Sequence, residues 1–126
     1  MTVSRPAVRV LVADDNRDAA DSLALMLALL GYDTRTVYDG ERACATAAEF
    51  EPDACLLDVH MPGVDGCEVA RRVRAAFGHR VLLVAITGVT GGEYDERVSR
   101  AGFNARFAKP CDPNELMRLL SAVCPR

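Results

Sequence analysis

Short apolar runs alternate with amphipathic stretches of helical period five times along this chain of 126 residues. The apolar runs predict strands at Val8–Ala13, Asp33–Val37, Ala54–Asp58, Val81–Thr87 and Asn104–Ala108. The other stretches predict helices over about 16–30, 40–50, 66–77 and 94–101, and a last helix capped by Asp112 or Asn114. Strands joined by helices form right-handed crossovers. The pattern therefore predicts a doubly wound α/β fold, with helices on both faces of a five-stranded parallel sheet.

The length and composition indicate a single domain over residues 1–126, with its core at about 8–123. The formal net charge is −3, and the basic residues are not clustered as on a nucleic-acid-binding face. The five cysteines lack paired CxxC spacing, which favours free thiols in a reducing compartment. We find no apolar signal sequence and no stretch long enough to span a bilayer. We therefore expect a cytoplasmic domain that contacts neither nucleic acid nor membrane directly.

Polar residues stand at the ends of four predicted strands. Asp14 and Asp15 follow the first strand, Asp58 ends the third, Thr87 ends the fourth, and Lys109, the chain's single lysine, follows the fifth. Each has a simpler interpretation, as a helix cap, a turn residue or a residue of high β-propensity. In parallel sheets, however, ligands bind beyond the carboxyl ends of the strands. Three carboxylates converging there would repel one another, and magnesium, which prefers oxygen ligands, would relieve the repulsion.

Four motifs resemble, in order and spacing, the receiver domain of two-component response regulators. They are Val12-Ala13-Asp14-Asp15-Asn16, Leu57-Asp58 with Met61-Pro62-Gly63-Val64-Asp65-Gly66, Thr87-Gly88 and Lys109-Pro110. The likeness extends from about Val8 to Val123, and the segment 101–105 is similar to receivers of hybrid kinases and phosphorelays. The resemblance implies a flavodoxin-like fold with strand order 2-1-3-4-5. It also implies a cis peptide bond between Lys109 and Pro110.

The same resemblance implies a function and a set of site residues. Asp58 would accept a phosphoryl group from a histidine kinase or a histidine phosphotransfer protein. Magnesium would be held by Asp14, Asp15, Asp58 and the backbone carbonyl of His60, and the phosphoryl oxygens by Thr87 and Lys109. Such a transfer needs positioning and neutralised charge more than covalent help, and these groups supply both. A receiver of this kind is a signalling module, whose only chemistry is its own phosphorylation and dephosphorylation, and the sequence does not identify its downstream protein partner.

Two other functions stay open. A degenerate receiver acting as a phosphorylation-independent interaction module is favoured only by Arg106, which stands at the switch position, where receivers commonly carry an aromatic ring. We expect Arg106 to reach outward or to pair with Glu93 or Asp95. Phe107 cannot replace the ring, because neighbouring strand residues face opposite sides of the sheet. An aspartate-nucleophile phosphatase would carry a second acid two residues after Asp58, where this chain has His60.

The predicted first helix carries apolar residues on two sides. The side expected to cover the sheet consists of Ala19, Ala20, Leu23, Met26, Leu27 and Leu30. Leu25, Ala28 and Leu29 lie opposite, mixed with acidic residues. This second side would either pack against the last helix or receive an amphipathic helix of a phosphodonor.

Overall fold

The computed structural model describes residues 7–88 and 93–125, with only the backbone at 93–95, and contains one parallel sheet of five strands. The strands are β1 (Arg9–Ala13), β2 (Asp33–Val37), β3 (Ala54–Asp58), β4 (Leu82–Thr87) and β5 (Ala105–Ala108). The helices are α1 (Arg17–Leu29), α2 (Gly40–Phe50), α3 (Gly66–Phe77), α4 (Glu93–Arg100) and α5 (Pro113–Ser121), with a short 3-10 turn at Gly78–Arg80. The strand order is β2-β1-β3-β4-β5. The predicted fold class, topology and elements are therefore confirmed.

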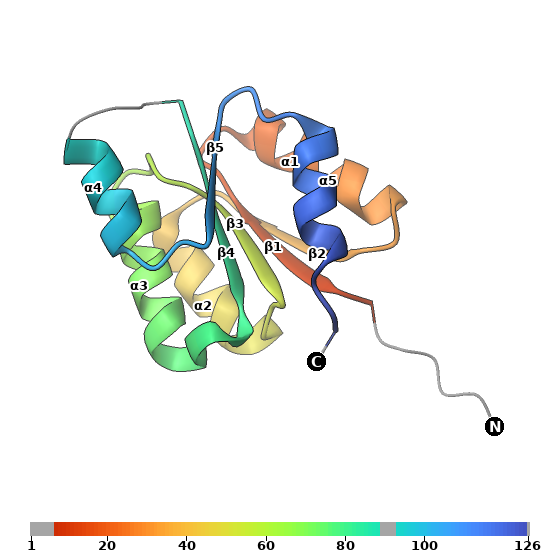
Figure 1. Ribbon diagram of the computed structural model, residues 1–126, viewed down its shortest axis with the longest axis horizontal. Coiled ribbons are helices and arrows are strands. Elements are labelled where there is room, and N and C mark those ends of the chain that lie inside the picture. The colour runs from red at the N-terminus through yellow and green to blue at the C-terminus, as the bar shows by residue number, and fades with distance from the viewer. Residues whose placement is uncertain (1–6, 89–92, 126) are drawn as a thin grey trace.

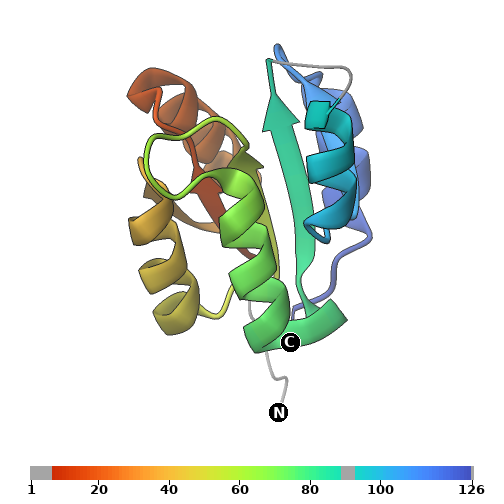
Figure 2. The same cartoon turned by 90° about the vertical axis from the view of Figure 1, so that its left-hand side faces the viewer.

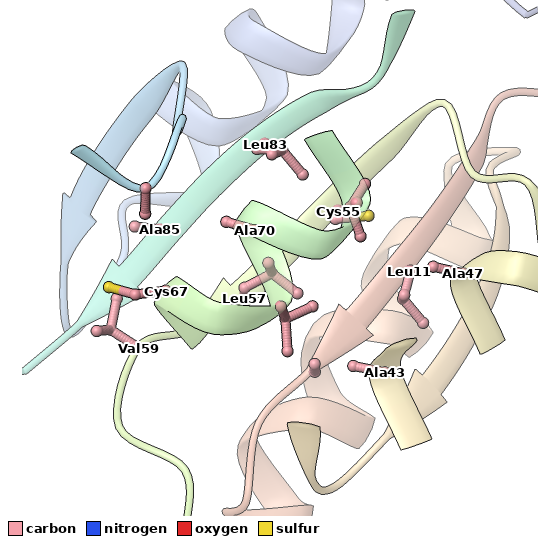
Figure 3. Packing of buried hydrophobic residues seen from close by; sticks show 14 of the residues in the cluster. Leu11, Ala43, Ala47, Cys55, Leu57, Val59, Cys67, Ala70, Leu83 and Ala85 are labelled. Carbon is pink, nitrogen blue, oxygen red and sulfur yellow. The ribbon is translucent and has the colours of Figure 1, made fainter. Parts of the chain in front are cut away.

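Helices cover both faces of the sheet. Figures 1 and 2 show α2, α3 and α4 on one face and α1 and α5 on the other. Leu11 and Leu57 belong to the apolar cluster beneath α2 and α3 (Figure 3), whereas Val10 and Leu56 belong to the cluster beneath α1 and α5. The two clusters draw on alternate residues of the same strands, because successive side chains of a strand point to opposite faces. Within the described part of the chain, no helix has the length and apolar character needed to cross a bilayer.

Side-chain caps fix where the helices begin. Asn16, Asp39 and Asp65 each accept a hydrogen bond from the backbone N–H three residues later. Asp112 accepts one from the N–H of Asn114, so Asp112, rather than Asn114, is the cap of α5. Each such cap contributes about 1 kcal/mol to stability. Because these helices follow parallel strands, the capped ends lie at the same edge of the sheet as the strands' carboxyl ends.

The first helix packs differently from the prediction on both of its sides. Ala20, Ala24 and Leu27 are buried against the sheet, with Leu23 and Met26 half-buried. Ala19 and Leu30 are exposed, because Ala19 lies at the margin of the apolar stripe and Leu30 is the C-cap, where the chain turns away at Gly31. Leu25 and Leu29 are 62% and 79% exposed, so packing of this side against α5 is also wrong.

Gly40, at the start of α2, lies against the loop that follows β3. A Cβ atom at this position would lie 1.8 Å from the carbonyl oxygen of Val64. We expect Gly40→Ala to lower the free energy of unfolding by about 1–3 kcal/mol, because the loop must move away from the helix. Urea denaturation checks this, with the exposed Ala48→Ser on the same helix as the control. Equal stability of the two variants would contradict the close packing.

Candidate functional site

Three carboxylates meet at the carboxyl edge of the sheet. Asp14 follows β1 directly, Asp15 comes next, and Asp58 is the last residue of β3, which pairs with β1. One carboxylate oxygen from each of the three lies within 4.8 Å of the other two. Asp14 and Asp58 are buried and Asp15 is exposed. The structure thus brings together the three acids that the sequence singled out.

Lys109 reaches the same cluster from the end of β5. Its Nζ lies 2.9 Å from Oδ2 of Asp14 and 3.4 Å from Oδ2 of Asp58. The Lys109–Pro110 peptide bond is cis, as predicted. Burial disfavours the charged ammonium, but the two carboxylates outweigh burial and raise the pKa of Lys109 above its ordinary value. The side chain is therefore a cation fixed between two acids.

Asp58 is destabilised as an anion. Its burial, followed by the negative charge of Asp14, raises the pKa of Asp58 from 3.8 to about 7. Lys109 and the backbone N–H of His60, which lies 3.2 Å from Oδ1 of Asp58, oppose this shift without cancelling it. One ammonium does not balance the local negative charge. A further positive charge at this place would therefore be favourable.

The donor set fits magnesium. Hard divalent cations prefer carboxylate and carbonyl oxygens, and magnesium usually takes one or two carboxylates together with waters and phosphate oxygens. The converging oxygens of Asp14, Asp15 and Asp58 meet this requirement. His60 lies in the loop beside them, with its side chain exposed and its N–H turned to Asp58. A metal at this position would also reduce the repulsion that raises the pKa of Asp58.

Thr87 stands at the carboxyl end of β4, the strand next to β3. It is fully buried. Its carbonyl oxygen accepts the backbone N–H of Lys109 at 2.9 Å, which connects the ends of β4 and β5. Beside these residues a largely apolar hollow of about 480 Å³ opens between α1 and the segment after β5, lined among others by Leu23, Ile86 and Pro110. This hollow leaves room for a group to approach the carboxylates from the α1 side.

Arg106, at the switch position, is exposed at the surface. It borders a surface hollow of about 400 Å³ between α4 and β5, whereas Phe107 packs into the apolar cluster beneath α1 and α5. The predicted alternation of these two residues is therefore confirmed. The acids expected near Arg106 cannot be compared, because the side chains of Glu93 and Asp95 lie outside the described residues.

Sequence reasoning missed the contacts that shape the loop between β3 and α3. Asp65 caps α3 and also forms an ion pair with Arg97 of α4. Arg97 and Asp65 stand 32 residues apart, so no local pattern connects them. The segment Asp65-Gly66-Cys67-Glu68 places an acid three residues before a glutamate at a helix start. This pattern signals the cap of α3 but not the ion pair.

Comparison with protein families gives a match over residues 10–121 to the model described as "Response regulator receiver domain". Among curated relatives, the chain is 34% identical over 114 residues to the "DNA-binding response regulator MtrA" of Mycobacterium leprae (strain TN), covering 90% of this chain and 50% of that protein. It is 35% identical over 122 residues to the "Response regulator MprA" of Mycobacterium bovis (strain BCG / Pasteur 1173P2), covering 95% and 52%. The chain thus spans about half the length of these relatives.

Solved structures give the same result. The receiver domain of sensor histidine kinase PA1611 from Pseudomonas aeruginosa PAO1, solved with magnesium in its active site cleft, is 33% identical with a TM-score of 0.83, over 92% of this chain and 96% of that chain. The chemotaxis protein CheY4 of Vibrio cholerae is 27% identical with a TM-score of 0.84, over 94% and 99%. The comparisons include both a kinase receiver and DNA-binding regulators. The narrower likeness to hybrid-kinase receivers therefore stays a prediction.

The raised pKa of Asp58 predicts a pH-dependent cost of the metal-free site. Because the pKa lies near 7 in the folded chain and near 3.8 when unfolded, the anion destabilises the fold progressively as pH rises from about 4 to 7. We expect Asp58→Asn to raise the free energy of unfolding at pH 8 by roughly 1–3 kcal/mol, and to lose this advantage near pH 4. Urea denaturation with a metal chelator, at both pH values, measures the difference. An equal effect of the substitution at pH 4 and pH 8 would contradict the raised pKa of Asp58.

Proposed function

Because the chain belongs to the response regulator receiver domain family, we propose that Asp58 is its phosphoacceptor. The observation that carries this proposal is the contact of Lys109 with both Asp14 and Asp58, since it joins a buried acid to a fixed cation beside a third carboxylate. A carboxylate oxygen held in this way can attack the phosphorus of a phosphohistidine presented from outside the sheet, while the P–N bond breaks and the imidazole leaves. The product would be an acyl phosphate on a residue at the end of β3.

The surrounding groups have distinct roles in the proposed transfer. Magnesium bound by Asp14, Asp15, Asp58 and the carbonyl of His60 would supply positive charge to the phosphoryl oxygens. Lys109 would move from pairing with Asp58 to holding a phosphoryl oxygen, since the acyl phosphate no longer offers a free carboxylate. Thr87 would donate its hydroxyl to another of these oxygens. Together these residues would neutralise the charge of the phosphoryl group and orient it during transfer, which is the main requirement of phosphoryl transfer.

The phosphodonor that we propose is a histidine kinase or a histidine phosphotransfer protein. Its helix would dock on the exposed side of α1, where Leu25 and Leu29 stand one turn apart and are 62% and 79% exposed. Exposed leucines in an i, i+4 pair form the kind of apolar stripe that an amphipathic helix covers. The hollow beside Leu23 and Pro110 lies between this helix and the carboxylates. A donor on α1 could thus present its histidine to Asp58.

The two rival functions have less support. A degenerate receiver would not need the complete set of three acids and a lysine, which this chain retains in contact. A phosphatase of the aspartate-nucleophile class needs a second acid two residues after the nucleophile, and His60 holds that position. The signalling role is therefore the function that the site supports best. The output partner is a protein that distinguishes the phosphorylated from the unphosphorylated form.

Replacement of the phosphoacceptor tests the central proposal. With acetyl phosphate and magnesium, we expect the wild-type chain to gain the mass of one phosphoryl group and Asp58→Asn to gain none, because an amide oxygen is a poor nucleophile. Asp39→Asn is the matched control, since it makes the same chemical change at an N-cap outside the site. Intact-mass spectrometry checks both variants. Undiminished phosphorylation of Asp58→Asn would refute the assignment.

Replacement of an exposed leucine tests the docking surface. We expect Leu25→Asp to leave the free energy of unfolding within about 0.5 kcal/mol, because the side chain is exposed. Phosphotransfer from a histidine phosphotransfer protein should slow at least about tenfold, because a charge would replace apolar contact at the interface. Phosphorylation by acetyl phosphate, which needs no docking surface, should be unchanged and serves as the control. Equal slowing with both donors would argue against docking at α1.

A further inference from the structure

Arg97 connects helix α4 to the loop between β3 and α3. Its guanidinium forms an ion pair with Oδ2 of Asp65, and Oδ1 of the same carboxylate accepts the backbone N–H of Glu68 at 2.9 Å. The side chain of Asp65 is 25% exposed and that of Arg97 is 48% exposed. A single carboxylate therefore caps α3 and ties its first turn to α4.

This ion pair holds the carboxylate in its charged form. Burial by itself would raise the pKa of Asp65. The N–H of Glu68 and the guanidinium of Arg97 outweigh burial and hold the pKa of Asp65 below its usual value. Both the cap and the ion pair consequently persist at neutral pH.

The loop that Asp65 ends is held from its other sides by packing. Val59 and Met61 are buried, and the carbonyl oxygen of Val59 accepts the N–H of Gly66 at 3.0 Å. Val64 lies against Gly40 of α2. On the side of α4, the ion pair from Arg97 to Asp65 connects this loop to the helix. His60 lies within this loop, next to Asp58.

We propose that Arg97 is a positioning residue for the cation site. By holding Asp65, it keeps the β3–α3 loop where the carbonyl of His60 and the carboxylate of Asp58 can face one cation. The inference deepens the proposed function and rests on it, because it concerns the magnesium that the phosphoryl transfer would use. Arg97 itself would touch neither metal nor phosphoryl group.

The sign of the effect separates positioning from simple electrostatics. Removing a positive charge near a cation site relieves Coulomb repulsion, and this effect alone would strengthen magnesium binding. Loss of a positioning contact would weaken it, because the loop would spend part of its time in arrangements that do not bind. Arg97→Gln should therefore weaken binding if the inference is correct and leave it equal or tighter if it is not.

Magnesium titrations followed by NMR amide shifts measure this affinity in the full chain. We expect Arg97→Gln to raise the Kd roughly two- to fivefold, the range that a partly exposed ion pair provides. Arg100→Gln is the matched control on the same helix, since Arg100 pairs only at 3.9 Å with Glu96 and both side chains are highly exposed. Arg97→Lys should recover part of the affinity, because it restores the charge.

A double-mutant cycle assigns the effect to the ion pair. Asp65→Asn keeps an oxygen that can cap α3 but loses the charge that faces Arg97. We expect it to weaken magnesium binding, and we expect the double variant with Arg97→Gln to bind no more weakly than Asp65→Asn alone. Additive losses would show that the two side chains act separately and would overturn the inference.

Hydrogen exchange of the metal-free protein gives a readout independent of the cation. The amides of His60, Met61, Gly63 and Val64 should exchange faster in Arg97→Gln than in Arg100→Gln if the ion pair restrains the loop. Unchanged exchange and unchanged or tighter magnesium binding in Arg97→Gln would overturn the inference while leaving the proposed function in place. A wild-type chain that binds no magnesium and accepts no phosphoryl group would overturn both.

Discussion

Repulsion between carboxylates at the ends of two adjacent strands governs the chemistry of this site. Asp14 directly follows β1 and Asp58 ends the neighbouring β3, and both are buried. The ammonium of Lys109 compensates for only one of their negative charges. The exposed Asp15 adds a third carboxylate, so a divalent cation is the natural counter-charge. A fold selected for stability alone would not bury such a set. The metal-free site carries a cost in folding free energy, which binding of a cation and of the proposed phosphoryl group would turn into affinity.

The fold supplies the rigidity that this charge cluster needs. Asp14, Asp58 and Lys109 each stand at the end of a strand or directly after it, so the hydrogen bonds of the sheet hold the backbone up to these residues. The carbonyl of Thr87 joins β4 to the start of the segment that carries Lys109. In the loop after β3, Val64 lies close to Gly40 of α2, and Asp65 caps α3. The loop that contains His60 is consequently held by contacts with α2, α3 and α4.

The sequence was most informative where local patterns determine structure. Strand and helix bounds followed from periodicity, and the start of the last helix followed from its capping residue Asp112, because these effects act within a few residues. The convergence of Asp58 and Lys109 followed from the rule that parallel strands end at one edge. Patterns failed where the outcome depends on which elements become neighbours. Leu25 satisfies the same helical pattern whether α5 covers it or not, and only the placement of α5 shows that it is exposed.

The exposed arginine at position 106 changes how the site can communicate with the rest of the domain. Phe107 is directed into the cluster beneath α1 and α5, so the α4 side of β5 presents no ring that could move inward. Among the described residues, two contacts join the carboxylate edge to this side of the molecule. One is the bond from Lys109 to the carbonyl of Thr87, and the other is the ion pair from Asp65 to Arg97. The first lies at the ends of β4 and β5, and the second starts in the loop that follows Asp58. If Asp58 is phosphorylated as proposed, the change in charge would reach α4 and β5 through these contacts rather than through an aromatic side chain of β5.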